Sequence, residues 1–131
     1  MWNYEKRLQF PVNIKEPNAK LAQVIISQFG GPDGELAASM RYLSQRFATP
    51  YKEVAGLLTD IGTEELAHLE MIGAIVFQLT RNLSMEEIEK SGFDKYYVDH
   101  TVGLWPQAAG GVPFNANQFQ SKGDIITDLF E

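Results

Sequence analysis

The sequence contains no cysteine and only two histidines among its 131 residues. The lack of cysteine excludes disulfide scaffolds, cysteine-based zinc sites and thiol catalysis. With no cysteine thiolate and only two histidines, any transition-metal site must be built mainly from oxygen atoms. This composition is compatible with a cytoplasmic location in the producing cell, which we take as the first expectation.

Positive charge and long apolar runs are also scarce. The 11 Lys and Arg residues are outnumbered by 17 Asp and Glu, and the basic residues form no cluster. Binding to nucleic-acid phosphates needs clustered positive charge, so we expect no nucleic-acid partner. No stretch approaches the roughly 20 apolar residues of a membrane span, so we expect none. A hydrophobic content of 44% instead indicates one folded domain covering residues 1–131.

The first part of the chain predicts an extended leader followed by a helix. Two prolines disfavour helix in residues 1–17. Asn18 is a suitable N-cap for the helix that follows. Residues 30–32, Gly-Gly-Pro, interrupt the apolar spacing. Either the helix ends there and Asp33 caps a second one, or one long helix is kinked at this point.

The second helix has the clearest pattern, from about Tyr51 to about Leu79, and completes a helix pair over residues 18–81. Its apolar residues recur at the spacing of one helical face. Continued through the middle of the helix, this stripe reaches Glu65 and His68. The predicted core stripe consists of Leu58, Ile61, Ile72, Ile75, Val76 and Leu79.

The remainder predicts two short helices separated by a long loop. Ser84 and Glu87 have the spacing of a capping box, and Gly92 is a helix stop. Residues 93–123 contain four glycines, two prolines and six aromatic residues, which indicates an irregular segment packed by its own side chains. Asp124 is the predicted cap of a last helix. The apolar face expected for that helix comprises Ile125, Ile126, Leu129 and Phe130.

Three side chains are candidate metal ligands. Glu65 and His68 are three residues apart on a helix, so their side chains are neighbours and can bind one ion. Glu35 points inward from the preceding helix, and a carboxylate among apolar residues needs a compensating charge. Ferritin-like carboxylate proteins take one Glu from a first helix and a Glu-x-x-His pair from the next, then repeat the set. The alternative is a surface glutamate and a hydrogen-bonded core histidine.

Longer stretches carry a resemblance to a known family. "GGPDGELAASMRYLSQRF" followed by "LLTDIGTEELAHLEMIGAIVFQL" resembles the manganese catalase family, and in particular its short branch from the bacterial spore coat. "RLQFPV" and "GVPFNANQFQSKGDIITDLFE" are similar to the same family. The resemblance implies an all-α, ferritin-like four-helix bundle. This chain would supply the first helix pair, a long loop and the start of a third helix.

The resemblance also implies a function and roles for particular residues. A complete site would hold two manganese ions and disproportionate hydrogen peroxide into water and dioxygen. Glu35 and His68 would each be a terminal ligand of one ion, and Glu65 would bridge the two. Tyr42 would hydrogen-bond a ligand glutamate, although a plain packing role for this aromatic residue is the alternative. No catalytic residue is expected beyond the metal ligands.

The sequence departs from the family in its second half. The resemblance implies a further ligand Glu, which would fall a few residues past Glu131. It also implies a second Glu-x-x-His, and no other Glu-x-x-His occurs in this sequence. The only other histidine, His100, lies in the loop and is expected to be structural or exposed. We therefore expect a domain that is incomplete at its C-terminal side. The missing half could come from a removed continuation of the chain, from a separate polypeptide, or from a second copy related by a two-fold axis.

Two other functions remain open at this point. The chain could be a non-catalytic structural or assembly protein of the spore coat, with other coat proteins as partners. Trp105, Phe114 and Phe119 in the loop would then suit an interface. Alternatively, the site could be that of a di-iron oxidase or peroxidase, because these ligands do not separate iron from manganese. A spore-coat location is accordingly a second expectation beside the cytoplasm.

Overall fold

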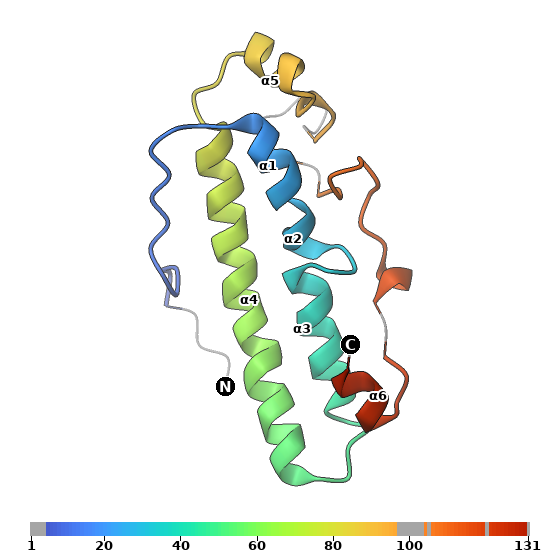
Figure 1. Ribbon diagram of the computed structural model, residues 1–131. Helices are drawn as coiled ribbons and strands as arrows, with labels where there is room; N and C mark the ends of the chain where they lie inside the picture. The colour runs from blue at the N-terminus through green and yellow to red at the C-terminus, as the bar shows by residue number, and fades with distance from the viewer. Residues whose placement is uncertain (1–4, 97–103, 105, 120, 131) are drawn as a thin grey trace.

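The chain folds into a long helical rod flanked by shorter helices (Figure 1). The computed structural model describes residues 5–96, 104, 106–119 and 121–130. Its α-helices are α1 (Ala19–Ile25), α2 (Ser27–Gly30), α3 (Glu35–Gln45), α4 (Lys52–Thr80), α5 (Met85–Ser91) and α6 (Ile125–Leu129). The prediction of an all-α fold is therefore confirmed. None of the described helices combines the length and apolar character needed to cross a bilayer.

The predicted helix pair is present, with α1, α2 and α3 following one side of α4 in succession (Figure 1). The Asn18 side chain accepts a hydrogen bond from the Leu21 amide, so the predicted N-cap of α1 is confirmed. The α4 helix begins and ends within one residue of the predicted bounds. These ends are determined by local capping and by the apolar repeat, which explains why they can be read from the sequence.

The interruption after α2 is a true break between helices. The α2 helix ends at Gly30, and Gly31 is extended, with φ −66° and ψ −170°. The N-cap of α3 is Gly34, so the assignment of Asp33 as the cap was wrong by one residue. A Cβ atom on Gly34 would lie 2.6 Å from the Gly30 backbone nitrogen. Glycine therefore permits the tight approach that places Glu35 at the start of α3.

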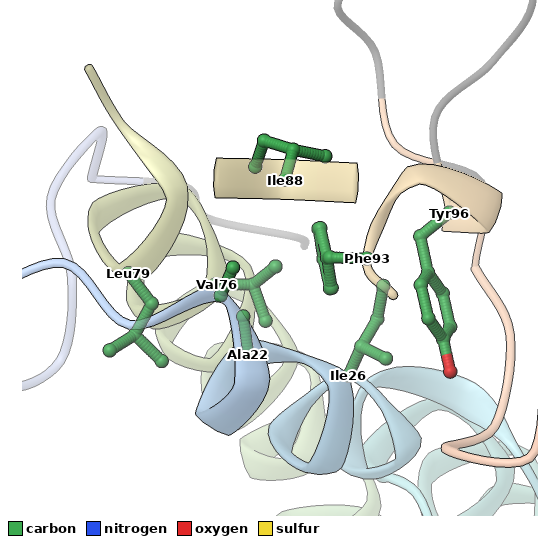
Figure 2. Close-up of a cluster of buried hydrophobic side chains, with 8 residues drawn as sticks. Ala22, Ile26, Val76, Leu79, Ile88, Phe93 and Tyr96 are labelled. Carbon is green, nitrogen blue, oxygen red and sulfur yellow. The ribbon is translucent and has the colours of Figure 1, made fainter. Parts of the chain in front are cut away.

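The main apolar core lies where α1, α4 and α5 meet (Figure 2). It consists of Ala19, Ala22, Ile26, Val76, Leu79, Ile88, Phe93 and Tyr96. Three residues of the predicted α4 stripe, Leu58, Val76 and Leu79, are buried. Ile61 is 36% exposed, so its assignment to the core was wrong for the part of the chain that the structure describes.

The loop after α5 packs against itself and against the first helices. The Phe93 and Tyr96 rings stack with centroids 4.8 Å apart. The Ala109 amide donates to the Ser27 hydroxyl at 2.6 Å. The ring of Phe114 lies over Gly30 and Gly31, where an added Cβ would meet it at about 3 Å. The prediction that this loop packs by its own side chains is thus confirmed for its described residues, whereas His100 and Trp105 lie outside them.

The last helix has the predicted cap but buries an unexpected residue. The Asp124 side chain accepts from the Thr127 amide at 2.9 Å. Asp128 is only 2% exposed, and its carboxylate accepts from the backbone amides of Lys122 and Gly123. The expected apolar face is present but open. Its members Ile126, Leu129 and Phe130 are exposed.

A close crossing of α3 and α4 lies next to the candidate ligands. The buried Ser39 hydroxyl donates to the Gly62 carbonyl at 2.7 Å. A Cβ atom on Gly62 would lie 2.8 Å from Cγ of Leu43. The absence of a side chain at position 62 therefore lets the two helices approach one turn before Glu65.

We expect Gly62→Ala to destabilise the protein, although alanine is the better helix former. Overpacking against Leu43 costs about 1–3 kcal/mol, which exceeds the gain of about 1 kcal/mol in helix propensity. Gly56 is the matched control on the same helix, because a Cβ there would meet nothing within 4 Å. Thermal unfolding should show a lower Tm for Gly62→Ala and a higher one for Gly56→Ala. Equal shifts for both variants would contradict the close crossing.

Candidate metal centre

The fold brings together the three ligands predicted from the sequence. Single donor atoms of Glu35, Glu65 and His68 all lie within 4.8 Å of one another. The Nδ1 atom of His68 is 2.6 Å from Oε2 of Glu65 and 3.6 Å from Oε2 of Glu35. Two carboxylates and the Nδ1 atom of an imidazole therefore converge between α3 and α4.

Each candidate ligand is placed by a different local feature. Glu35 is the first residue of α3, where the unpaired amides of the helix N-terminus favour a negative charge. Glu65 and His68 lie one turn apart in the middle of α4, so their relative position is determined by helix geometry. Glu65 is the most enclosed, with a side chain 13% exposed, compared with 27% for Glu35 and 33% for His68.

The two carboxylates strongly influence each other. Burial, followed by the hydrogen bond and negative charge of Glu65, raises the pKa of Glu35 from 4.5 to about 7. Burial acts to lower the pKa of His68, but the hydrogen bond to Glu65 and the charges of Glu65, Glu35 and Glu64 outweigh it, so that pKa is raised. In the metal-free protein the cluster therefore retains protons at neutral pH.

The donor set fits a divalent cation. Among the described residues, the ion pairs of Glu35 and Glu65 are both with His68, and neither carboxylate pairs with a lysine or arginine. Two partly buried carboxylates lack a fixed positive partner, and a divalent ion would provide one. Two oxygens and one imidazole nitrogen suit manganese and iron equally. Glu35, Glu65 and His68 are the residues that would hold the ion.

Other predicted residues have different outcomes. Tyr42 is partly buried on α3, and no hydrogen bond among the described residues joins its hydroxyl to Glu35, so its supporting role stays a prediction. The sequence reasoning missed Glu64, which is a neighbour of His68, and Gln9, which contacts Glu64. The Oε1 atom of Glu64 lies 3.7 Å from Nε2 of His68 and accepts a hydrogen bond from Gln9. The i,i+4 spacing could have indicated Glu64, whereas no local pattern indicates Gln9.

An apolar cavity of about 320 Å³ lies beside α4 and includes none of the three ligands. Its lining is Ile26, Phe29, Gly73, Val76, Phe77, Leu104 and Pro106. This lining offers no ionisable side chain to a reacting group. The chemistry that the structure supports is therefore centred on the carboxylate and histidine cluster.

We expect metal binding to weaken as the pH falls below 7. Below that pH a proton occupies Glu35, and a cation must displace it. The raised pKa of His68 acts in the same direction, because a protonated imidazole cannot bind a cation through that nitrogen. Each proton displaced lowers the affinity about tenfold per pH unit. Calorimetric titration with Mn²⁺ between pH 5.5 and pH 8 measures this slope. An affinity independent of pH would show that these groups do not hold the metal.

Together, the fold and the site define a class of protein. The helix pair, with one Glu from the first helix and a Glu-x-x-His pair from the second, is that of a ferritin-like carboxylate protein. The sequence matches the family described as "Manganese containing catalase" over residues 1–131. The chain belongs to that family.

The relatives extend further than this chain. "Protein CotJC" of Bacillus subtilis (strain 168) is 53% identical over 131 residues, which cover all of this chain and 69% of the relative. A "Probable manganese catalase" of Clostridium acetobutylicum is 33% identical, with 98% of this chain and 58% of the relative covered. The crystal structure of KatB, a manganese catalase from Anabaena PCC7120, superposes with a TM-score of 0.81 at 30% identity. That match covers 99% of this chain and 58% of KatB.

Proposed function

We propose that this chain supplies half of a di-manganese site that disproportionates hydrogen peroxide into water and dioxygen. The observation that carries the proposal is the convergence of Glu35, Glu65 and His68 within 4.8 Å in a member of the manganese catalase family. A bound manganese pair supplies redox chemistry in which one peroxide is oxidised to dioxygen and another is reduced to water. In this assignment Glu65 would bridge the two ions, and Glu35 and His68 would be terminal ligands.

The chain's own residues have three tasks in this proposal. The carboxylates of Glu35 and Glu65 neutralise cation charge, and Nδ1 of His68 supplies the nitrogen ligand. The break at Gly34 and the crossing at Gly62 hold α3 and α4 at the separation that lets these ligands meet. Leu36 on α3 and Ile72 on α4 are half-buried and would limit access of water, whereas the exposed Ile61 would not.

Completion of the site requires a second helix pair. The chain spans about 58% of KatB and of the Clostridium relative, and it contributes three of the six side chains in the expected ligand set. Large apolar side chains are exposed along the same two helices, as a half-bundle requires. They include Met40, Leu57, Ile61 and Phe77, and Phe47 just after α3 is exposed as well. We propose that a second copy or a complementary C-terminal segment covers them and adds the remaining ligands.

Oxygen evolution tests the activity. The purified protein, loaded with Mn²⁺ and sized by light scattering, should release one dioxygen for every two peroxide molecules consumed. The Glu65→Gln variant is the control and should release none. Peroxide consumption that requires an added electron donor and yields no dioxygen would instead indicate a peroxidase. Activity that appears with Fe²⁺ and not with Mn²⁺ would support the di-iron alternative.

The structural alternative is a coat component without turnover. We propose a spore-coat location from the resemblance to the short coat branch, supported by the 53% identity to CotJC. Of the loop aromatics considered for an interface, Phe114 packs against Gly30 and Gly31 within the chain, which weakens its case as an interface anchor. Manganese-dependent dioxygen release would count against a purely structural role.

A further inference from the structure

The two ring nitrogens of His68 have different neighbours. Nδ1 faces the metal cluster, 2.6 Å from Glu65 and 3.6 Å from Glu35. Nε2 faces Oε1 of Glu64 at 3.7 Å, on the other side of the ring. A histidine that binds a metal through one nitrogen carries its proton on the other, and a carboxylate at that proton fixes the ring and its tautomer. Glu64 occupies that position.

Glu64 is itself held by the N-terminal leader. The Gln9 side-chain amide donates to Oε1 of Glu64 at 2.9 Å. This is the same oxygen that faces His68. Both Gln9 and Glu64 are exposed at the surface, so neither is needed to fill the core. A contact between residues 55 positions apart in the sequence therefore orients Oε1 of Glu64 toward Nε2 of His68.

The leader is fixed to α4 at a second place, which gives Gln9 a defined position. Gln78 uses both atoms of its side-chain amide, accepting from the Ile14 amide at 2.7 Å and donating to the Val12 carbonyl at 2.8 Å. Arg81 donates to the Ile14 carbonyl at 2.8 Å. Figure 1 shows the leader on the side of α4 away from α1, α2 and α3. It thus follows α4 from the level of Glu64 to the end of the helix.

We propose that Glu64 is a positioning residue for His68, and that the leader sets its orientation through Gln9. The inference rests on the proposed role of His68 as a metal ligand. The present 3.7 Å separation is an ion-pair distance, and a ring movement of less than about 1 Å brings it within hydrogen-bonding range. Exchange of the Nδ1 contact with Glu65 for a cation leaves the ring free to make that movement.

Mn²⁺ titration of paired variants tests the inference. Glu64→Ala should raise the Kd for Mn²⁺ about 10–100-fold, the usual cost of losing a group that supports a ligand. Gln9→Ala should act in the same direction with a smaller effect, and Glu64→Gln, which keeps an acceptor oxygen, should restore part of the affinity. The matched control is Asp60→Ala, which removes another exposed carboxylate one turn earlier on α4. We expect its Kd to change by less than about 3-fold, because only screened long-range charge is lost.

A second readout separates positioning from general structural support. The protein has two histidines, so His100→Gln leaves His68 as the only imidazole. With Zn²⁺ as a diamagnetic probe, the Nε2 proton of His68 should give a downfield, slowly exchanging NMR resonance. Glu64→Ala should shift that resonance upfield and speed its exchange, while Asp60→Ala should leave it unchanged.

The outcomes distinguish failure of this inference from failure of the proposed function on which it rests. If the unmodified protein binds Mn²⁺ and Glu64→Ala binds it as well as Asp60→Ala does, the positioning role is overturned and the metal site remains. An equal loss in both variants also overturns it, because general charge then explains the effect. If the unmodified protein binds no Mn²⁺, both the inference and the proposed function fail.

Discussion

Replacing Glu65 with glutamine is expected to abolish manganese binding at micromolar metal. Glu65 is the most enclosed of the three candidate ligands, and its carboxylate contacts both other members of the cluster. Glutamine has nearly the same shape but carries no charge and offers one acceptor oxygen instead of two. The affinity should therefore fall by more than the roughly 10–100-fold that loss of a supporting group costs. Calorimetry with Mn²⁺ at pH 8 measures the change.

The matched control for this variant is Glu53→Gln. Glu53 is an exposed acidic residue in the first turn of the same helix and lies outside the cluster. The Glu53→Gln variant should leave both the Kd for Mn²⁺ and the fold unchanged. Circular dichroism should show equal helix content in the two variants, because neither change enters the apolar core. Retention of Mn²⁺ affinity by Glu65→Gln would show that Glu65 is not a metal ligand.

Replacing Glu35 with glutamine should have opposite effects with and without manganese. Burial and the neighbouring Glu65 raise the pKa of Glu35 to about 7 in the folded protein, compared with its ordinary value of 4.5. The folded state therefore binds the proton more tightly than the unfolded state, and stability falls as the pH rises from about 4.5 to 7. Above pH 7 the folded protein bears the full cost of holding an ionised Glu35 beside Glu65. Glutamine carries no charge and removes this cost, so metal-free Glu35→Gln should be more stable than the unmodified protein at pH 8.

The expected gain in free energy of unfolding is about 1–2 kcal/mol, since solvent around the partly exposed carboxyl reduces the full linkage energy. The gain should vanish at pH 4, where Glu35 is protonated in both states. Saturating Mn²⁺ should reverse the order, because a ligand at 100 times its Kd stabilises the protein that binds it by about 2.7 kcal/mol. Asp33→Asn, two residues away at an exposed position, is the control and should show no reversal.

Thermal melts at pH 4 and pH 8, each with and without Mn²⁺, measure all four states. A Glu35→Gln variant that is less stable than the unmodified protein at pH 8 without metal would show that the two carboxylates do not repel each other. A variant that gains as much stability from Mn²⁺ as the unmodified protein would show that Glu35 is not a ligand.

Much of the fold follows from local patterns in the sequence. The apolar repeat of α4, the Asn18 cap and the Ser84–Glu87 capping box each depend on residues within a few positions of one another. For the same reason the pairing of Glu65 with His68 could be predicted, since one helical turn separates them. The start of α3 was misplaced by one residue because the approach of Gly34 to Gly30 is a contact between two backbone segments. Such a contact leaves no hydrophobic pattern.

The remaining differences between prediction and structure arise where tertiary contacts determine which side chains are buried. The exposure of Ile61 and of the apolar face of α6 depends on which elements cover them, and no spacing rule specifies that. Asp128 is buried because the Lys122 and Gly123 amides satisfy its carboxylate, which reverses the orientation expected from polarity. The contact between Gln9 and Glu64 depends on the path of the leader along α4.

The most direct test of the metal site is whether the imidazole of His68 binds manganese. Electron spin-echo modulation of Mn²⁺-loaded protein detects a nitrogen bound to the ion, and labelling histidine with ¹⁵N identifies it as imidazole. We predict histidine-derived nitrogen modulation in the unmodified protein and in His100→Gln, and its loss in His68→Gln. Modulation that persists in His68→Gln, or bound Mn²⁺ without histidine modulation in the unmodified protein, would contradict the site formed by Glu35, Glu65 and His68.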